Sequence, residues 1–129
     1  MERSGMVIDT GVFIQHLRAT IKERTVLYNL PTDQELCVSS VTVYELYMGA
    51  TDPQKQGHVA TLLNGLKVLP FDDAVAKQAA TIFHELKKVN QLIEFRDIFI
   101  AATAKTNQLP IVTLNKKHFQ RIQGLQLVS

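Results

Sequence analysis

Four oxygen-bearing side chains stand where the sequence pattern changes from strand to helix. Asp9 directly follows the apolar run "MVI", and Glu45 lies in the helical segment after the apolar run "LCVS". Asp97 opens the helical segment "DIFIAATAKT", and Asn115 follows the run "PIVTL". Carboxylate and amide oxygens are hard ligands that suit Mg²⁺ or Mn²⁺. The set therefore raises the hypothesis of a divalent-cation site.

Each of these residues also has a purely structural explanation. Asp9 and Asn115 suit helix N-caps, Glu45 matches a capping box with Thr42, and Asp97 would complement a helix dipole. Capping does not explain why the helix after Asp97 is apolar almost all round, or why Glu45 lies within "VYELYM". Acids that border buried apolar surface are costly unless they are paired or bound to metal. Taken together, the four residues favour the cation site.

Other chemistries lack their sequence patterns. The chain contains no nucleotide-binding G-x-x-x-x-G-K-[ST] or G-x-G-x-x-G loop and no G-x-S-x-G nucleophile elbow. Its four histidines are scattered without zinc-ligand spacing. Cys37 lies inside the run "ELCVSS" and is expected to be a small buried residue, not a nucleophile. A phospho-accepting aspartate domain would need a second acid close to Asp9, and none is there.

Short β-rich runs and helical patterns alternate along the whole chain. Strands are predicted at 6–8, 36–39, 67–71, 110–114 and 125–128. Helical spacing of apolar residues predicts helices at 11–23, 41–50, 59–66, 75–86, 97–106 and 116–121. This alternation predicts an α/β fold with a parallel sheet and helices on both faces. Ligands of such sheets bind at the carboxyl ends of the strands, which is where the four residues fall.

Composition limits the class of protein. The 129 residues, 46% of them hydrophobic, predict one domain over residues 1–129, with 1–5 as a flexible leader. A net charge of +2 permits a nucleic-acid partner without predicting one. The single cysteine is typical of a reducing compartment, so we expect a cytoplasmic protein. No apolar stretch reaches the roughly 18 residues of a membrane span, and none is expected.

Four segments resemble, in order, the signature segments of the PIN-domain family, and specifically its VapC-type toxins. They are "VIDTGVFI", "VSSVTVYELYMGA", "FRDIFIAATAKTNQLPIVTLNKKHF" and "RIQGLQLV". The resemblance runs from about Met6 to Val128. It implies a three-layer α/β/α sandwich around a parallel sheet, and an Mg²⁺- or Mn²⁺-dependent endoribonuclease that hydrolyses RNA phosphodiester bonds as the toxin of a toxin–antitoxin pair.

The resemblance also assigns roles to residues. Asp9, Glu45 and Asp97 match the family's metal-binding acids. Thr113 matches a nearby hydroxyl, and Asn115 stands where many members carry a fourth acid. An amide offers a carbonyl oxygen without charge, so Asn115 would hold a second cation more weakly than a fourth carboxylate would. In this hypothesis the three acids hold the cation, while Thr113 and Asn115 position a water molecule or a phosphate oxygen.

Several basic residues fall beside the same predicted sheet edge. Contacts with RNA phosphates would account for them, and so would an ordinary solvated helix face. These candidates are Arg96, Lys116, Lys117 and Arg121.

Family resemblance further implies a VapB-like antitoxin and a homodimer. Some apolar residues exceed what one buried face requires and are interface candidates, although core packing explains them equally well. These are Tyr28, Leu30, Leu46, Tyr47 and Met48. Two rival functions stay open: a catalytically weak PIN-fold module that only binds RNA or its partner, and a phosphatase that acts on small phosphomonoesters.

Overall fold

The central element of the fold is a four-stranded parallel sheet with the order β3-β2-β1-β4. It is seen in a computed structural model that describes residues 4–128. The strands are β1 (Gly5–Ile8), β2 (Glu35–Ser39), β3 (Lys67–Leu69) and β4 (Ile111–Val112). The helices are α1 (Thr10–Arg18), α2 (Ser40–Gly49), α3 (Pro53–Leu63), α4 (Asp73–Lys88), α5 (Phe95–Thr106) and α6 (Lys116–Phe119), with a short 3-10 helix, η1 (Lys22–Arg24).

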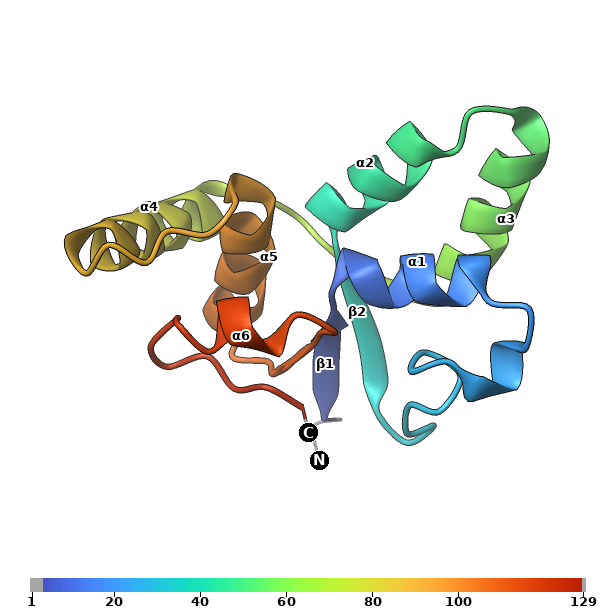
Figure 1. Ribbon diagram of the computed structural model, residues 1–129, viewed down its shortest axis with the longest axis horizontal. Helices are drawn as coiled ribbons and strands as arrows, with labels where there is room; N and C mark the ends of the chain where they lie inside the picture. The colour runs from blue at the N-terminus through green and yellow to red at the C-terminus, as the bar shows by residue number, and fades with distance from the viewer. Residues whose placement is uncertain (1–3, 129) are drawn as a thin grey trace.

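Helices cover both faces of the sheet, which gives three layers. Helices α1, α2 and α3 lie on one side of the strands, and α4, α5 and α6 lie on the other (Figure 1). Successive side chains of a strand point to opposite faces. Accordingly, Val7 and Cys37 pack with α4 and α5, whereas Met6, Ile8 and Val38 pack with α1 and α2. The predicted α/β/α sandwich and the predicted burial of Cys37 are confirmed.

Helix α5 supplies much of the core on its side of the sheet. Its buried residues are Ile98, Ile100, Ala101, Ala102, Thr103 and Ala104. The nearly all-round apolar pattern thus correctly predicted a buried helix. The helix begins at Phe95, two residues before the predicted start, so Asp97 lies within its first turn.

The first predicted helix is too long. Helix α1 ends at Arg18, and Ala19 has an extended backbone conformation. The apolar side chain of Ile21 had suggested a continuing helical stripe, but Ile21 is exposed. The side chain of Lys22 returns to the end of α1 and donates to the carbonyl oxygens of His16 and Leu17. These carbonyls therefore receive hydrogen bonds from a lysine and not from another helical turn.

The two ends of the chain also differ from prediction. Gly5, expected in the leader, belongs to β1 and pairs with Glu35. A Cβ atom at Gly5 would come within 3.2 Å of the Glu35 carbonyl oxygen, so this close pairing favours glycine. Residues 1–3 lie outside the described residues. The predicted strand at 125–128 forms only a single parallel bridge between Leu127 and Ile111.

Among residues 4–128, no helix is long and apolar enough to cross a membrane.

Candidate functional site

Asp9 lies at the junction between β1 and α1 and is almost fully buried, at 7% exposure. Its N–H donates to the carbonyl oxygen of Val112, 2.9 Å away, which ties the junction to the end of β4. Its carboxylate accepts two hydrogen bonds, one on each oxygen. Oδ1 accepts from the Thr10 N–H at 2.9 Å, and Oδ2 accepts from the Thr113 hydroxyl at 2.8 Å. Asp9 therefore does cap α1 as one reading predicted, while it also enters a wider polar cluster.

The electrostatics of Asp9 are unfavourable to its charged form. Burial raises the pKa of Asp9 to about 6, although the hydrogen bond from Thr113 opposes this shift. The negative charges of Asp97 and Glu45 raise the pKa further, so all three carboxyl groups lie close enough to repel one another. A bound cation would favour the charged carboxylates and relieve this repulsion.

Glu45 is held by a directed pair of hydroxyl groups. Its Oε1 accepts from the Thr10 hydroxyl at 2.8 Å, and the Thr10 and Thr42 hydroxyl oxygens are 2.9 Å apart. A hydroxyl has one proton, so when Thr10 donates to Glu45 it is Thr42 that donates to Thr10. The predicted capping box between Thr42 and Glu45 is wrong, because Ser39 caps α2 by accepting from the Val41 N–H at 3.1 Å.

The side chains of Asp97 and Asn115 both approach the imidazole ring of His118. The Oδ2 of Asp97 and the Nδ2 of Asn115 lie 3.9 and 2.7 Å from Nδ1 of His118. The backbone N–H of Asn115 donates to the Thr113 hydroxyl at 2.9 Å. Burial raises the pKa of Asp97, and the His118 charge opposes this shift. Asn115 occupies the N-cap position of α6 but makes no side-chain capping bond, so its predicted capping role is wrong.

Polar contacts therefore link all five predicted central residues at the carboxyl edge of the sheet. One series of contacts runs from Asp9 through Thr113 and Asn115 to His118 and Asp97. A second series joins Asp9 to Glu45, because Thr10 contacts the first through its N–H and the second through its hydroxyl. The contacts span segments more than 100 residues apart in the chain, and the parallel sheet brings these segments together.

Arg96 lies against this cluster on the exposed side. Its Nη1 is 3.1 Å from Oε2 of Glu45, and its Nη2 is 3.3 Å from Oε2 of Glu94. Hydrogen bonding to Glu94 and the charge of Glu45 raise the pKa of Arg96. Arg96 was a candidate for RNA contact, and the structure places it in ion pairs with these two carboxylates.

The remaining basic candidates divide into two kinds. Lys116 and Lys117 are exposed on α6, directly after Asn115. Arg121 instead directs Nη1 toward the carbonyl oxygens of Gln91 and Leu92, at 3.5 and 3.3 Å. Arg121 thereby connects the end of α6 to the loop before α5, which is a structural role.

The donor set fits a hard divalent cation by its chemistry. Three carboxylates, whose oxygens are the donors that such cations prefer, approach one edge of the sheet. Burial is the main cause of the raised pKa of Asp9, and the charges of the other two carboxylates add to it. In the part of the chain that the structure describes, no three histidine, cysteine or carboxylate side chains lie close enough together to hold a metal ion as they stand. Glu45 is engaged with Arg96, so cation binding would require this carboxylate to exchange partners.

Two contributors were not recognised as site residues from the sequence. The Thr10 hydroxyl donates a hydrogen bond to Glu45, and Thr10 was not among the candidates from the sequence. His118 is one of the four scattered histidines that lacked zinc-ligand spacing, and its Nδ1 lies between Asp97 and Asn115. The position of Thr10 directly after Asp9 was the one sequence feature that could have indicated its role. Its hydrogen-bond partner, Glu45, is 35 residues away, so local spacing does not reveal the contact.

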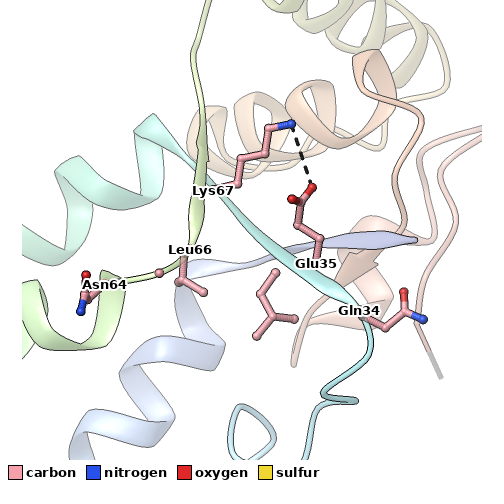
Figure 2. A pocket seen from close by; sticks show the side chains of 7 residues that line it. Gln34, Glu35, Asn64, Leu66 and Lys67 are labelled. Carbon is pink, nitrogen blue, oxygen red and sulfur yellow. Dashed lines mark ion pairs between the residues drawn. The ribbon is translucent and has the colours of Figure 1, made fainter. Parts of the chain in front are cut away.

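A separate hollow lies at the amino end of the sheet, opposite the acidic cluster. It has a volume of about 530 Å³ and is lined by Gln34, Glu35, Leu36, Asn64, Gly65, Leu66 and Lys67 (Figure 2). These residues stand at the amino ends of β2 and β3, where Lys67 and Glu35 approach to 4.0 Å. Ligands of parallel sheets bind at the carboxyl ends of the strands. Size alone therefore does not make this hollow the functional site.

The chain is similar to known proteins over nearly its whole length. The family model described as PIN domain matches residues 6–125. Ribonuclease VapC10 of Mycobacterium tuberculosis is 30% identical over 121 residues, covering 94% of this chain and 90% of that protein. The tRNA(fMet)-specific endonuclease VapC of Shigella flexneri is 32% identical over 127 residues, covering 93% of each. The solved structure of DNA-bound VapBC from Salmonella typhimurium gives a TM-score of 0.86 at 27% identity, covering 97% of each chain.

Proposed function

The chain belongs to the PIN domain family and to its VapC group, and on that premise we propose that it is a metal-dependent endoribonuclease, the toxin of a VapBC-type pair. The observation that carries the proposal is the approach of Asp9, Glu45 and Asp97 at the carboxyl edge of the sheet. Relatives named as ribonucleases match this chain along more than nine-tenths of its length.

The three acids would hold Mg²⁺ or Mn²⁺. When bound, such a cation lowers the pKa of coordinated water and offsets negative charge on phosphoryl oxygens. The Thr113 hydroxyl and the Thr10 N–H hold the two oxygens of Asp9, and the Thr10 hydroxyl holds Glu45. These bonds fix the carboxylates before substrate arrives, which reduces the reorganisation that charge development would otherwise require.

The proposed reaction adds water to one RNA phosphodiester bond. A bond forms between phosphorus and the water oxygen, and the bond from phosphorus to one ribose oxygen breaks. The products carry one phosphate end and one hydroxyl end, and the carboxylate cluster is available to accept the proton of the attacking water. No covalent intermediate is required, so the burial of Cys37 agrees with this scheme.

The RNA backbone would approach from the α6 side. Lys116 and Lys117 are exposed beside Asn115 and would contact phosphates next to the one that is cleaved. Asn115 and His118 lie between these lysines and Asp97, so their polar groups could orient a phosphate oxygen or a water molecule.

We further propose a VapB-like antitoxin partner and a homodimer. The matching solved structure from Salmonella typhimurium is described as a VapBC complex bound to DNA. Among the interface candidates, Tyr28 and Met48 are exposed at 60% and 54%. Leu46 is 4% exposed and packs in the core, so its assignment to an interface is wrong.

Cleavage of a structured RNA tests the proposal. Wild-type protein should cut the RNA with Mg²⁺ or Mn²⁺ and leave it intact in EDTA, and Asp9→Asn should be inactive. Asp33→Asn is the matched control, because Asp33 is exposed in the turn before β2 and should retain activity. Equal trace activity in wild type and Asp9→Asn would reject the nuclease and favour the binding module without catalysis.

A further inference from the structure

A small apolar cleft opens beside the acidic cluster. It has a volume of about 360 Å³ and is lined by Ser40, Val41, Tyr44, Phe71, Arg96 and Phe99. Its walls come from the start of α2, the chain that leaves β3 and the first turns of α5. In Figure 1, that chain passes between α2 and α5 on its way to α4. The volume lies toward the small end of the range for ligand sites, which is about 300–1,000 Å³.

Aromatic rings dominate the cleft, and two of them are fixed against each other. The rings of Phe71 and Phe99 meet edge to face, with centroids 4.8 Å apart and planes at 65°. The backbone N–H of Phe71 donates to the Ser40 hydroxyl at 3.1 Å, which attaches the loop to the start of α2. Tyr44 lines the cleft and is 63% exposed. The cleft is therefore preformed on one side and open on the other.

The cleft and the acidic cluster share a wall. Arg96 lines the cleft, and its Nη1 lies 3.1 Å from the carboxylate of Glu45. Tyr44, on the cleft, directly precedes Glu45 in α2. A nucleotide whose phosphate lies at the acids would thus bring its own base, or that of its neighbour, to the mouth of the cleft.

We propose that this cleft binds one unpaired nucleobase of the RNA substrate, with Tyr44 as the stacking partner. The inference rests on the proposed function, because it places the scissile phosphate at the acidic cluster. Aromatic side chains and arginine guanidinium groups are the usual stacking partners of unpaired bases in RNA-binding proteins. The apolar lining would take the face of the base, and Arg96 would contact its edge or the adjoining phosphate.

The position of the cleft favours RNA over a protein side chain as its occupant. A base-binding site must lie within about one nucleotide of the catalytic acids, and the cleft meets this condition through Arg96, which contacts both. Arg96 at its rim pairs with Glu45 and Glu94, and it becomes available to a phosphate group when Glu45 exchanges Arg96 for the cation. An aromatic side chain of a protein partner is the competing occupant.

A double-mutant cycle tests the proposal: the bases are removed from the RNA in one step, and the Tyr44 side chain is removed from the protein in the other. Affinities are measured by fluorescence anisotropy for two end-labelled RNA octamers of equal charge, one of adenosines and one of abasic ribose phosphates. Ca²⁺ replaces Mg²⁺ so that the carboxylates are neutralised, and a gel checks that the RNA stays intact. In wild type, the adenosine octamer should bind more tightly. Tyr44→Ala should reduce this preference about 5- to 140-fold, the range expected for loss of one stacked base.

Two further variants make the cycle specific. Tyr44→Phe keeps the ring and should keep the preference for the adenosine octamer. Val89→Ala is the matched control, since Val89 is 60% exposed at the end of α4 and does not line the cleft, so the preference should be unchanged. Because the preference is a ratio measured within each variant, a general change in affinity cancels.

Several results would overturn the base-binding proposal: no binding by wild type, equal binding of both octamers, or the same preference in Tyr44→Ala as in wild type. Loss of antitoxin binding in Tyr44→Ala with an unchanged RNA preference would assign the cleft to the protein partner. The proposed function fails by a different observation, the lack of cation-dependent RNA cleavage. The two failures are therefore distinguishable.

Discussion

At the scale of single residues, the Asp9 carboxylate is destabilised by burial and by neighbouring negative charges, although both of its oxygens accept hydrogen bonds. Asp9 is buried and near two other carboxyl groups, yet each of its oxygens accepts a hydrogen bond. Burial and repulsion together outweigh these bonds, because the pKa of Asp9 is raised and not lowered. A residue that is costly to the fold in this way is typical of a functional position.

The cost at Asp9 predicts that Asp9→Asn stabilises the metal-free protein at neutral and alkaline pH. The folded pKa is about 6, against 3.8 for the ordinary group, so the folded state binds the extra proton between these values. The contribution of Asp9 to stability should therefore fall as pH rises from about 4 to 6, by about 3 kcal/mol in all. The variant carries no such penalty and should be about 1–3 kcal/mol more stable at pH 8, after the loss of some hydrogen bonding.

Urea unfolding in EDTA at pH 8 and at pH 4 measures this difference. The gain of the variant should disappear at pH 4, where the wild-type carboxyl group is protonated. Asp33→Asn, at an exposed position, should match wild type at both pH values. An Asp9→Asn variant that is less stable than wild type at pH 8 would show that the Asp9 carboxylate does not destabilise the fold.

Local sequence reasoning reached the identity of the acids but not their partners. Asp9 and Glu45 could be predicted because they fall at the end of a strand or in the helix after it. Asp97 follows α4 and no strand, and the nearly all-round apolar pattern of its helix indicated it. The ion pair between Arg96 and Glu45 joins residues 51 positions apart, so it depends on how α2 and α5 meet. The same holds for His118 beside Asp97, whose contact follows from the position of α6 after β4.

At the scale of elements, the sequence pattern predicted helices and strands correctly where the element is buried in the core, and less well at the edge of the sheet. The long apolar helix α5 was predicted almost correctly, because its pattern and its burial agree. The segment 125–128 was predicted as a strand, yet it lies at the sheet edge and forms one bridge with Ile111. A segment with strand-forming residues still needs neighbouring strands to pair with, and this segment has only β4 beside it.

Helix α6 is short and basic, which predicts a measurable electrostatic contribution to RNA binding. The double variant Lys116→Ala/Lys117→Ala should weaken the binding of single-stranded RNA, because both side chains are exposed beside the acidic cluster. Binding measured over a range of salt concentrations should show a log–log slope smaller by about 1.4, from about 0.7 per phosphate contact. Lys87→Ala/Lys88→Ala, at the end of α4, is the matched control. An equal change in slope for both double variants would contradict a specific role for α6.

At the scale of the whole molecule, the parallel sheet explains why distant residues form one site. All four strands point the same way, so the residues that follow β1, β2 and β4 meet at one edge. The alternation of strands and helices was enough to predict this edge. It was not enough to predict the strand order β3-β2-β1-β4, or the cleft of Tyr44, Phe71 and Phe99, because both depend on long-range packing.

The proposed homodimer leads to a prediction about self-association. Sedimentation velocity should give a mass twice that of the chain, and Met48→Lys should shift the protein toward the monomer, because burying an uncompensated charge is costly. Val68→Lys is the matched control, since Val68 is exposed at 50% against 54% for Met48 and lies on the edge strand β3. A monomer at all concentrations would contradict the dimer, and equal effects of the two variants would move the interface away from α2.

The central claim is that Asp9, Glu45 and Asp97 form one divalent-cation site, and calorimetric titration with Mn²⁺ tests it most directly. Wild type and Asp33→Asn should bind Mn²⁺ with the same affinity. Asp9→Asn and Asp97→Asn should each bind at least about tenfold more weakly, because loss of a ligand should cost no less than loss of a residue that merely orients one. Undiminished Mn²⁺ binding in both variants, or no binding by wild type, would contradict the account.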